Sequence, residues 1–149
     1  MLLQTLKPLF DRDLRKLRSE IDAYRTEANI WHIPEGIANS AGNLCLHLVG
    51  NLNWFIGAQL GRTGYVRDRA LEFSAKDLPR AQLLAQLDAT IAMLPKALDQ
   101  VTDEQLAADY PLLVFQEKTT TMFFLLHLST HLSYHLGQMN YHRRMVEGL

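Results

Sequence analysis

Histidines recur at helical spacing in an otherwise apolar segment near the end of the chain, and few folds accommodate that pattern. His127, His131 and His135 follow one another at four-residue steps, and His142 comes seven residues later. Helical spacing traces one continuous stripe along this segment, made of Phe124, Leu128, His131, His135, Gln138, His142 and Met145. A stripe of this kind faces a protein core, although about half of this one is polar. Because an unpartnered buried polar group costs about 1–3 kcal/mol, we expect specific partners for these side chains.

A metal ion would satisfy several of these imidazoles at once. Side chains four residues apart on a helix have Cβ atoms roughly 5 to 6 Å apart, and from that span two imidazole nitrogens can converge on one ion. His131 and His135 meet this requirement, so we predict that both are metal ligands. His127 directly precedes Leu128 and falls at the edge of the stripe, so we expect it in the surrounding pocket rather than on the ion.

A second segment offers a third ligand from an inward position. Between Ser40 and Ala58, the same helical spacing places on one stripe Leu44, His47, Asn51, Trp54 and Ala58. His47 is therefore predicted to join the histidine pair, and Asn51, Gln138 and His142 are predicted to surround the ion or line its pocket. Three neutral imidazoles would leave a fourth coordination position open for water or substrate, as in catalytic zinc sites.

The identity of the ion and the purpose of the histidines stay open at this point. Zinc and nickel are the ions we expect first, and the same donors would accept iron, cobalt or manganese. Alternatively, the histidines complete a polar core of a non-catalytic protein by hydrogen bonding to one another and to Asn51 and Gln138. Other catalytic signatures are missing, including the Glu-x-x-His pairs of di-iron proteins, His-Glu-x-x-His and Gly-x-Ser-x-Gly.

Size and charge narrow the classes of protein to which the chain can belong. Its 149 residues, 48% of them hydrophobic, predict a single domain over residues 1–149. The formal charge of −1 gives no electrostatic case for binding nucleic acid or an anionic membrane. No apolar run approaches the roughly 20 residues that a membrane span needs. The one cysteine, Cys45, excludes an intrachain disulfide and fits a cytoplasmic protein.

Four long amphipathic helices are expected. They are predicted at Thr5–Asp22, from Ser40 to about Leu60, from a cap at Asp77 with a kink or an early end at Pro95, and from Thr119–Thr121 to about Glu147. Phe10, Leu14, Leu17 and Ile21 form the apolar seam of the first helix. The third helix has an apolar seam without histidine, formed by Leu84, Leu87, Ile91, Leu94 and Leu98, so it should supply no ligand. Thr102–Gln105 resembles a capping box that opens one further short turn. Four such helices with one longer crossover predict an all-α four-helix bundle.

The connection after the second helix contains a compact set of charges that ends in an aromatic residue, Arg67-Asp68-Arg69-Ala70-Leu71-Glu72-Phe73. By chemistry alone, this set predicts a surface turn with internal ion pairs. A contact with a ligand or with another subunit is the alternative, and the sequence leaves the role of these charges undecided.

Taken together, these motifs resemble the DinB/YfiT-like superfamily of metal-binding proteins. In that superfamily a C-terminal His-x-x-x-His, often followed by x-Gly-Gln, joins a histidine of the second helix around one divalent ion. His131, His135 and Gln138 match the C-terminal motif and His47 matches the other ligand. The segment from Arg67 to Phe73 looks like that of one uncharacterised branch.

The resemblance implies an up-down-down-up four-helix bundle, commonly a homodimer, with an open metal site and a small-molecule substrate. Characterised relatives include thiol-dependent transferases and isomerases that use bacillithiol, mycothiol or glutathione, and some members are described as metal-dependent hydrolases. A low-molecular-weight thiol is therefore a further cofactor to expect. This sequence departs from many relatives at Leu136, where they carry an arginine.

Overall fold

The computed structural model describes all residues, 1–149, as an all-α protein. Six α-helices are present: α1 (Leu2–Asp22), α2 (Ala41–Leu52), α3 (Arg69–Ser74), α4 (Arg80–Leu98), α5 (Asp103–Ala107) and α6 (Thr121–Val146). A short 3₁₀ helix, η1 (Glu27–Ile30), follows α1, and a π-helical segment, η2 (Asn53–Ala58), extends α2. No helix combines the length and the apolar character needed to cross a membrane.

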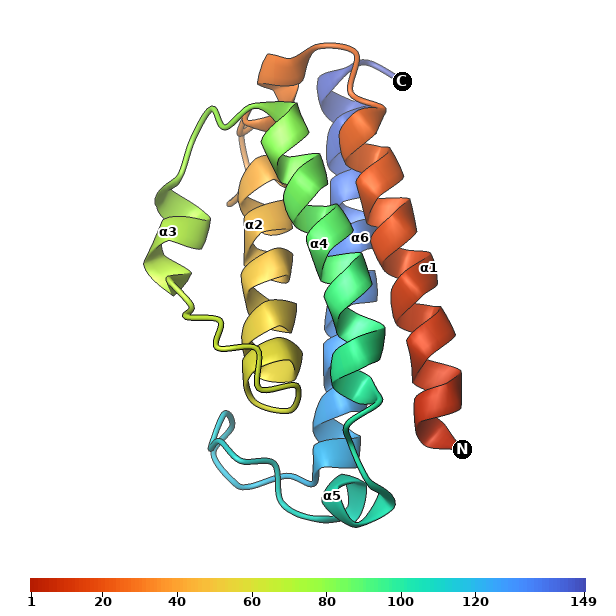
Figure 1. Ribbon diagram of the computed structural model, residues 1–149. Coiled ribbons are helices and arrows are strands. Elements are labelled where there is room, and N and C mark those ends of the chain that lie inside the picture. The colour runs from red at the N-terminus through yellow and green to blue at the C-terminus, as the bar shows by residue number, and fades with distance from the viewer.

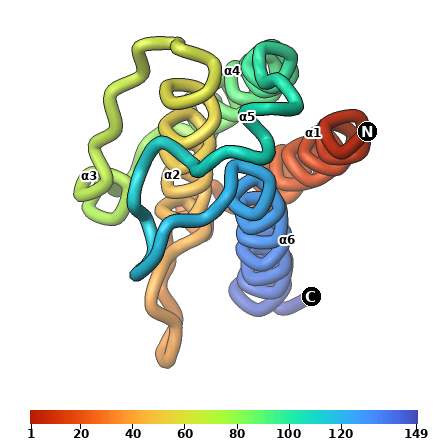
Figure 2. Tube along the Cα trace, turned by 90° about the horizontal axis from the view of Figure 1, so that it is seen from below, coloured from red at the N-terminus to blue at the C-terminus, as the bar shows by residue number.

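The four long helices lie side by side in two directions. In Figure 1, α1 and α6 run one way, and α2 and α4 run the opposite way. Both α1 and α2 contact α4 and α6, so the four helices share one core. Seen end-on in Figure 2, the short helix α3 lies outside α2, on the side away from α1. This arrangement places α2 between α6 and α3.

The core follows the predicted apolar seams closely on α1. Phe10, Leu14, Leu17 and Ile21 are all buried, as their spacing predicted. On α4 the buried seam is Leu83, Leu87, Thr90, Leu94, Ala97 and Leu98, so Leu84 and Ile91 only border the core. The helix continues through Pro95 and ends three residues later, which places its end within one turn of the predicted break.

Side-chain caps fix where most of these helices begin. Ser40 caps α2 by accepting a hydrogen bond from the backbone N–H of Asn43, and Thr102 and Gln105 form the predicted capping box of α5. The predicted cap at Asp77 is wrong, because α4 begins only after Pro79. Asp77 has a left-handed backbone with φ of 57°, and Pro79 has an extended ψ of 140°, so the helix starts only at Arg80.

The end of α2 is less regular than predicted. The helix changes to π-helical hydrogen bonding at Asn53, whose side-chain amide donates to the carbonyl of Val49 and to the hydroxyl of Thr90, each at 2.8 Å. The backbone N–H of Gly61 then bonds the carbonyl of Ile56, which terminates the turn at the predicted stop. These bonds tie the lower end of α2 to α4 and leave its upper part facing α3 and α6.

Candidate metal centre

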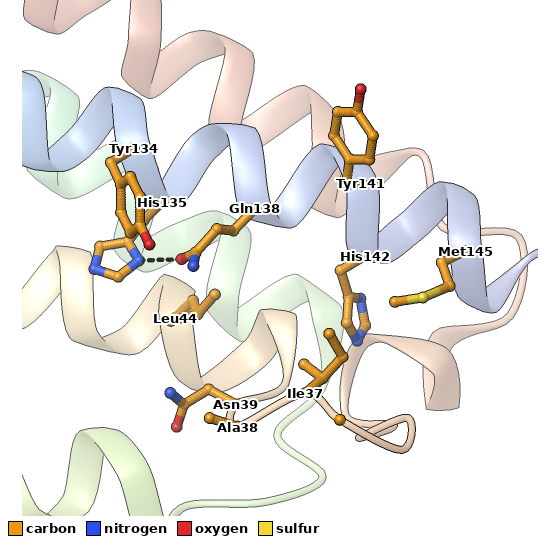
Figure 3. A pocket seen from close by; sticks show the side chains of 11 residues that line it. Ile37, Ala38, Asn39, Leu44, Tyr134, His135, Gln138, Tyr141, His142 and Met145 are labelled. Atoms are coloured by element: carbon orange, nitrogen blue, oxygen red, sulfur yellow. Dashed lines mark hydrogen bonds between the residues drawn. The ribbon is translucent and has the colours of Figure 1, made fainter.

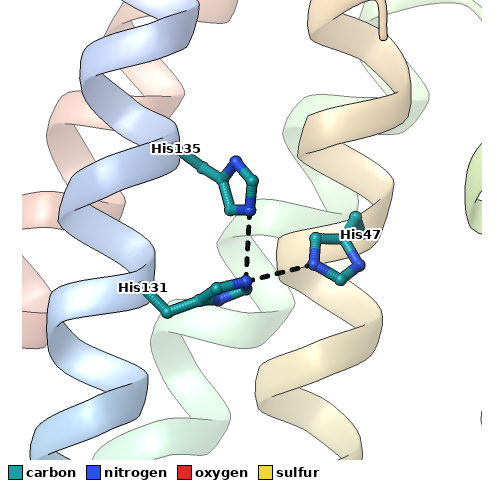
Figure 4. A group of neighbouring side chains, drawn as sticks. All are labelled: His47, His131 and His135. Carbon is teal, nitrogen blue, oxygen red and sulfur yellow. Dashed lines mark hydrogen bonds between the residues drawn. The ribbon is translucent and has the colours of Figure 1, made fainter. Parts of the chain in front are cut away.

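Three histidines from two helices meet between α2 and α6 (Figure 4). Nε2 of His131 lies 3.3 Å from Nε2 of His47 and 3.1 Å from Nε2 of His135. One ring nitrogen from each of the three residues lies within 4.8 Å of the other two, so the group could hold a metal ion. The structure therefore brings together the three residues that the sequence predicted as ligands.

The spacing of these nitrogens fits a tetrahedral ion. Two imidazole nitrogens that each lie about 2.0–2.1 Å from one tetrahedral ion are about 3.3–3.4 Å apart. The separations of 3.3 and 3.1 Å from His131 are close to that value, and the nitrogens of His47 and His135 lie within 4.8 Å of each other. Two of the three separations therefore already match a tetrahedral ion.

Neighbouring side chains also fix which nitrogens are free to bind. Nδ1 of His47 lies 3.1 Å from a carboxylate oxygen of Glu72, and Nδ1 of His135 lies 2.7 Å from the amide oxygen of Gln138. Both partners accept hydrogen bonds, so each Nδ1 carries the proton and each Nε2 presents a lone pair. Nε2 of His131 can donate one proton to these two lone pairs, whereas a cation would satisfy all three nitrogens.

Glu72 is held in place by a second charged residue. Nε and one terminal nitrogen of Arg67 each donate to Glu72 at 2.8 Å, and Glu72 is only 5% exposed. Burial opposes ionisation of the carboxyl group, but the hydrogen bonds from Arg67 and His47 outweigh it and lower the pKa of Glu72. The carboxylate therefore stays charged and orients His47, as acidic partners do for metal-binding histidines elsewhere.

Two further contacts position Glu72 against α2. The side-chain amide of Asn43 donates to the backbone carbonyls of Glu72 and Ala75, at 3.0 and 2.8 Å, which holds α3 on α2. Gly50 leaves room for the carboxylate, because a Cβ atom there would lie 2.0 Å from Oε2 of Glu72. A side chain of α3 thus makes the close approach that the absence of a Cβ at Gly50 permits.

The predicted internal ion pair of the charged segment is present between Arg67 and Glu72, but its place on the surface is wrong, because these two side chains are only 10% and 6% exposed. Asp68 and Arg69 are exposed, and Asp68 caps α3. Glu72 points inward because α3 packs on α2, and Arg67, just before α3, turns inward to pair with it. The sequence signal was an acidic residue five positions after a basic one, and that pattern is too common to identify a partner for His47.

The predicted stripe of α6 faces the core only in part. Phe124, Leu128 and His142 are buried, whereas His131 and His135 are partly exposed and Gln138 and Met145 are exposed. The expectation that the two histidines lie on an interior seam is therefore wrong, and they border the core. The consequence is chemical, because the imidazoles lie at an opening between α2 and α6 that small molecules can reach.

Burial keeps His131 and His135 neutral by lowering the pKa of each. Desolvation, assisted by the neighbouring His135 and His47, lowers the pKa of His131 to about 4. Burial also lowers the pKa of His135. Neutral imidazole is the form that binds metal ions, so these ligands are ready at neutral pH.

The remaining predicted residues occupy different places around the centre. Gln138 contacts His135 as predicted. Asn51 is buried, and its side-chain oxygen has no hydrogen-bond partner, as is also true of Nδ1 of His131. Neither atom belongs to the group of converging Nε2 nitrogens, so the predicted place of Asn51 around the ion stays a prediction. His127 stacks on His131 with ring centroids 6.0 Å apart and stays outside the three-residue group.

His142 lies apart from the three histidines, in a pocket that reaches His135. Its Nδ1 accepts a hydrogen bond from the hydroxyl of Tyr24 at 2.7 Å, and its Nε2 donates to the carbonyl of His32 at 2.9 Å. The residue thereby fastens the segment after α1 to α6. The neighbouring pocket has a volume of about 550 Å³ (Figure 3).

Comparison with known proteins gives a family but no activity. No curated protein matches the sequence. A family model does match it, over residues 2–148, and its description is a protein of unknown function, DUF1572. The match spans α1 to α6 and includes all three histidines. The chain belongs to the DUF1572 family.

Proposed function

We propose that this protein is a metal-dependent enzyme in which His47, His131 and His135 hold one divalent ion. The proposal rests on one observation above all, the convergence of three Nε2 atoms, two of which (those of His47 and His135) have their lone pairs directed inward by Glu72 and Gln138. Zinc or nickel is the expected ion, and iron, cobalt or manganese would fit the same donors. An ion held there would lower the pKa of a bound water to about 7, or hold a thiolate or carbonyl oxygen.

The fold supports placing the DUF1572 family within the DinB/YfiT-like superfamily. The order of helix directions in Figure 1 fits an up-down-down-up four-helix bundle, with ligands on its second and fourth long helices. On this basis we propose attack of a metal-activated thiol or water on a small electrophilic substrate, in a cytoplasmic homodimer. Light scattering of the purified protein tests the dimer.

Metal content provides the first test of the proposal. Purified protein should contain about one equivalent of a divalent ion by elemental analysis, and His131→Ala should lose it. His127→Ala is the matched control, because His127 lies four residues earlier on α6 and outside the three-histidine group. Retention of a full equivalent by His131→Ala would refute the ligand assignment.

The competing proposal is a non-catalytic protein whose histidines complete a polar network. A chelator separates the two, because an ion that binds only the native state raises stability by about 2.7 kcal/mol at a hundred times its dissociation constant. For a domain of this size, that corresponds to a rise of about 5 to 11 °C in Tm. An unchanged Tm after verified removal of the metal would favour the non-catalytic protein.

Assignment of the reaction needs a substrate screen. Metal-loaded protein should turn over a small electrophile either in water alone or only with an added thiol, and His47→Ala should abolish turnover in both cases. Turnover that survives this substitution would place the chemistry elsewhere.

A further inference from the structure

The pocket beside the candidate metal centre has a distinctive lining. It lies between α6 and the segment that leads into α2, and His135 belongs both to its wall and to the three-histidine group. Its volume of about 550 Å³ lies within the range of roughly 300–1,000 Å³ typical of small-molecule sites. A molecule seated there would have one end next to the three histidines.

No side chain that lines this pocket carries a charge at neutral pH. Apolar contacts come from Ile37, Leu44 and Met145 and from the rings of two tyrosines, and no aspartate, glutamate, lysine or arginine takes part. His142 is held neutral, since it accepts from Tyr24 and burial lowers its pKa. A charged ligand would lose its hydration there without gaining an ionic partner.

The two ends of the pocket differ in polarity. Figure 3 shows the amide of Gln138 next to His135 at one end, Asn39 beside Ala38 further along, and Ile37 and Met145 beside His142 at the other end. The amide oxygen of Gln138 already accepts from His135, which leaves its N–H groups to donate. The polar end therefore offers hydrogen bonds at the histidines, and the apolar end offers only surface to bury.

Arg67 cannot supply a charge to this pocket. It lies beside His47, already donates twice to Glu72, and its guanidinium also lies 5.4 Å from the ring centroid of Phe55. Leu136 leaves α6 without a cation next to His135. Among the lining side chains, the carboxylates of a thiol such as glutathione would therefore find no ionic partner.

We propose that the pocket binds the substrate of the metal centre, and that this substrate is an uncharged, mostly apolar small molecule with one hydrogen-bonding group beside His135. The inference rests on the proposed function for its link to catalysis. That the substrate is neutral and mostly apolar is inferred from the lining of the pocket alone.

A matched set of aromatic probes tests this proposal on the protein with and without bound metal, and the comparison between the probes is made on the metal-free form, where no ion can attract the anionic probe. Naphthalene-2-carboxamide is neutral, whereas naphthalene-2-sulfonate and naphthalen-2-ylmethylammonium carry opposite charges on the same ring system. We expect the amide to bind at least tenfold more tightly than either ion, measured by calorimetry. Binding of either ion as tightly as the amide would overturn the proposal.

Lysine substitutions at the exposed edge of the pocket test whether the amide binds there. Tyr141 and Met145 are 74% and 51% exposed, so Tyr141→Lys and Met145→Lys should fold normally. Each should weaken binding of the amide by at least tenfold without changing the metal content. Phe123→Lys is the matched control, since this exposed aromatic of α6 lies outside the pocket.

The outcomes separate this inference from the proposed function. Protein that takes up no metal but binds the amide through the pocket would refute the metal centre and leave the pocket standing. Protein with one equivalent of metal whose affinity for the amide is unchanged by both lysine variants would refute the pocket alone.

Discussion

Replacement of Glu72 by glutamine tests how the candidate metal centre is held. Glutamine keeps the size of the side chain and can still accept a hydrogen bond from Nδ1 of His47, but it removes the negative charge. The carboxylate accepts from His47 at 3.1 Å and twice from Arg67 at 2.8 Å, so the substitution also leaves a guanidinium that is only 10% exposed without its counter-ion. Substitutions of such outer partners usually weaken metal binding by about 10- to 100-fold.

We therefore expect Glu72→Gln to weaken metal affinity by about 10- to 100-fold, or roughly 1.4 to 2.7 kcal/mol. The assay is competition with a chromophoric chelator at neutral pH, using zinc. Urea unfolding of the metal-free protein measures the separate loss of stability, which we place at about 1–3 kcal/mol for an unpaired buried group.

The chain contains a matched control for this substitution. Glu20 is equally buried, at 2% exposure, and pairs with Arg143 at 2.8 Å between α1 and α6, away from the three histidines. Glu20→Gln should lower stability by a similar amount and leave zinc affinity unchanged. If both variants lost zinc affinity equally, or if Glu72→Gln kept it, the role of Glu72 in orienting His47 would be refuted.

Three further predictions concern the same region. Gly50→Ala should weaken zinc binding at least as much as Glu72→Gln, because the new methyl group would displace the carboxylate; calorimetry with zinc checks this. Ser40→Ala should cost about 1 kcal/mol, or about 2–4 °C in Tm, through loss of the α2 cap, seen in a thermal melt. The metal-free protein should lose stability as pH falls from about 6.5 towards 4. In that interval His131 becomes protonated in the unfolded chain but stays neutral in the folded chain, where its pKa is about 4. Urea titrations at several pH values measure the free energy of unfolding, which should depend less on pH in His131→Ala than in the unmodified protein.

Local sequence rules were sufficient for the parts of the fold that depend on periodicity and caps. The seam of α1 and the cap at Ser40 follow from the identity of a few neighbouring residues, and the structure confirms both. The histidine group was predictable for the same reason, because helical spacing alone places His131 and His135 one turn apart. Only the meeting with His47 needed the added assumption that two stripes face each other.

The features that could not be predicted correctly from the sequence depend on contacts between distant segments of the chain. Arg67 and Glu72 are buried because Asn43 holds α3 against α2, and no periodic pattern in a six-residue helix reveals that packing. The histidine stripe was assigned to the core because a stripe beside the core has the same period as one within it. The partnership of Tyr24 with His142 joins residues 118 positions apart, which no local signal reports.

The three ligands differ in how firmly they are held, and this difference ties the chemistry to α3. His47 has a charged carboxylate behind it, His135 has a neutral amide from its own helix, and Nδ1 of His131 has no partner. A carboxylate raises the basicity of the imidazole that it orients more than an amide does, so His47 should be the strongest donor of the three. The segment from Arg67 to Glu72 would therefore tune an ion bound by these histidines, while the long helices only bring the nitrogens together. A protein with the same four long helices and the same three histidines, but without this segment, should bind its metal more weakly.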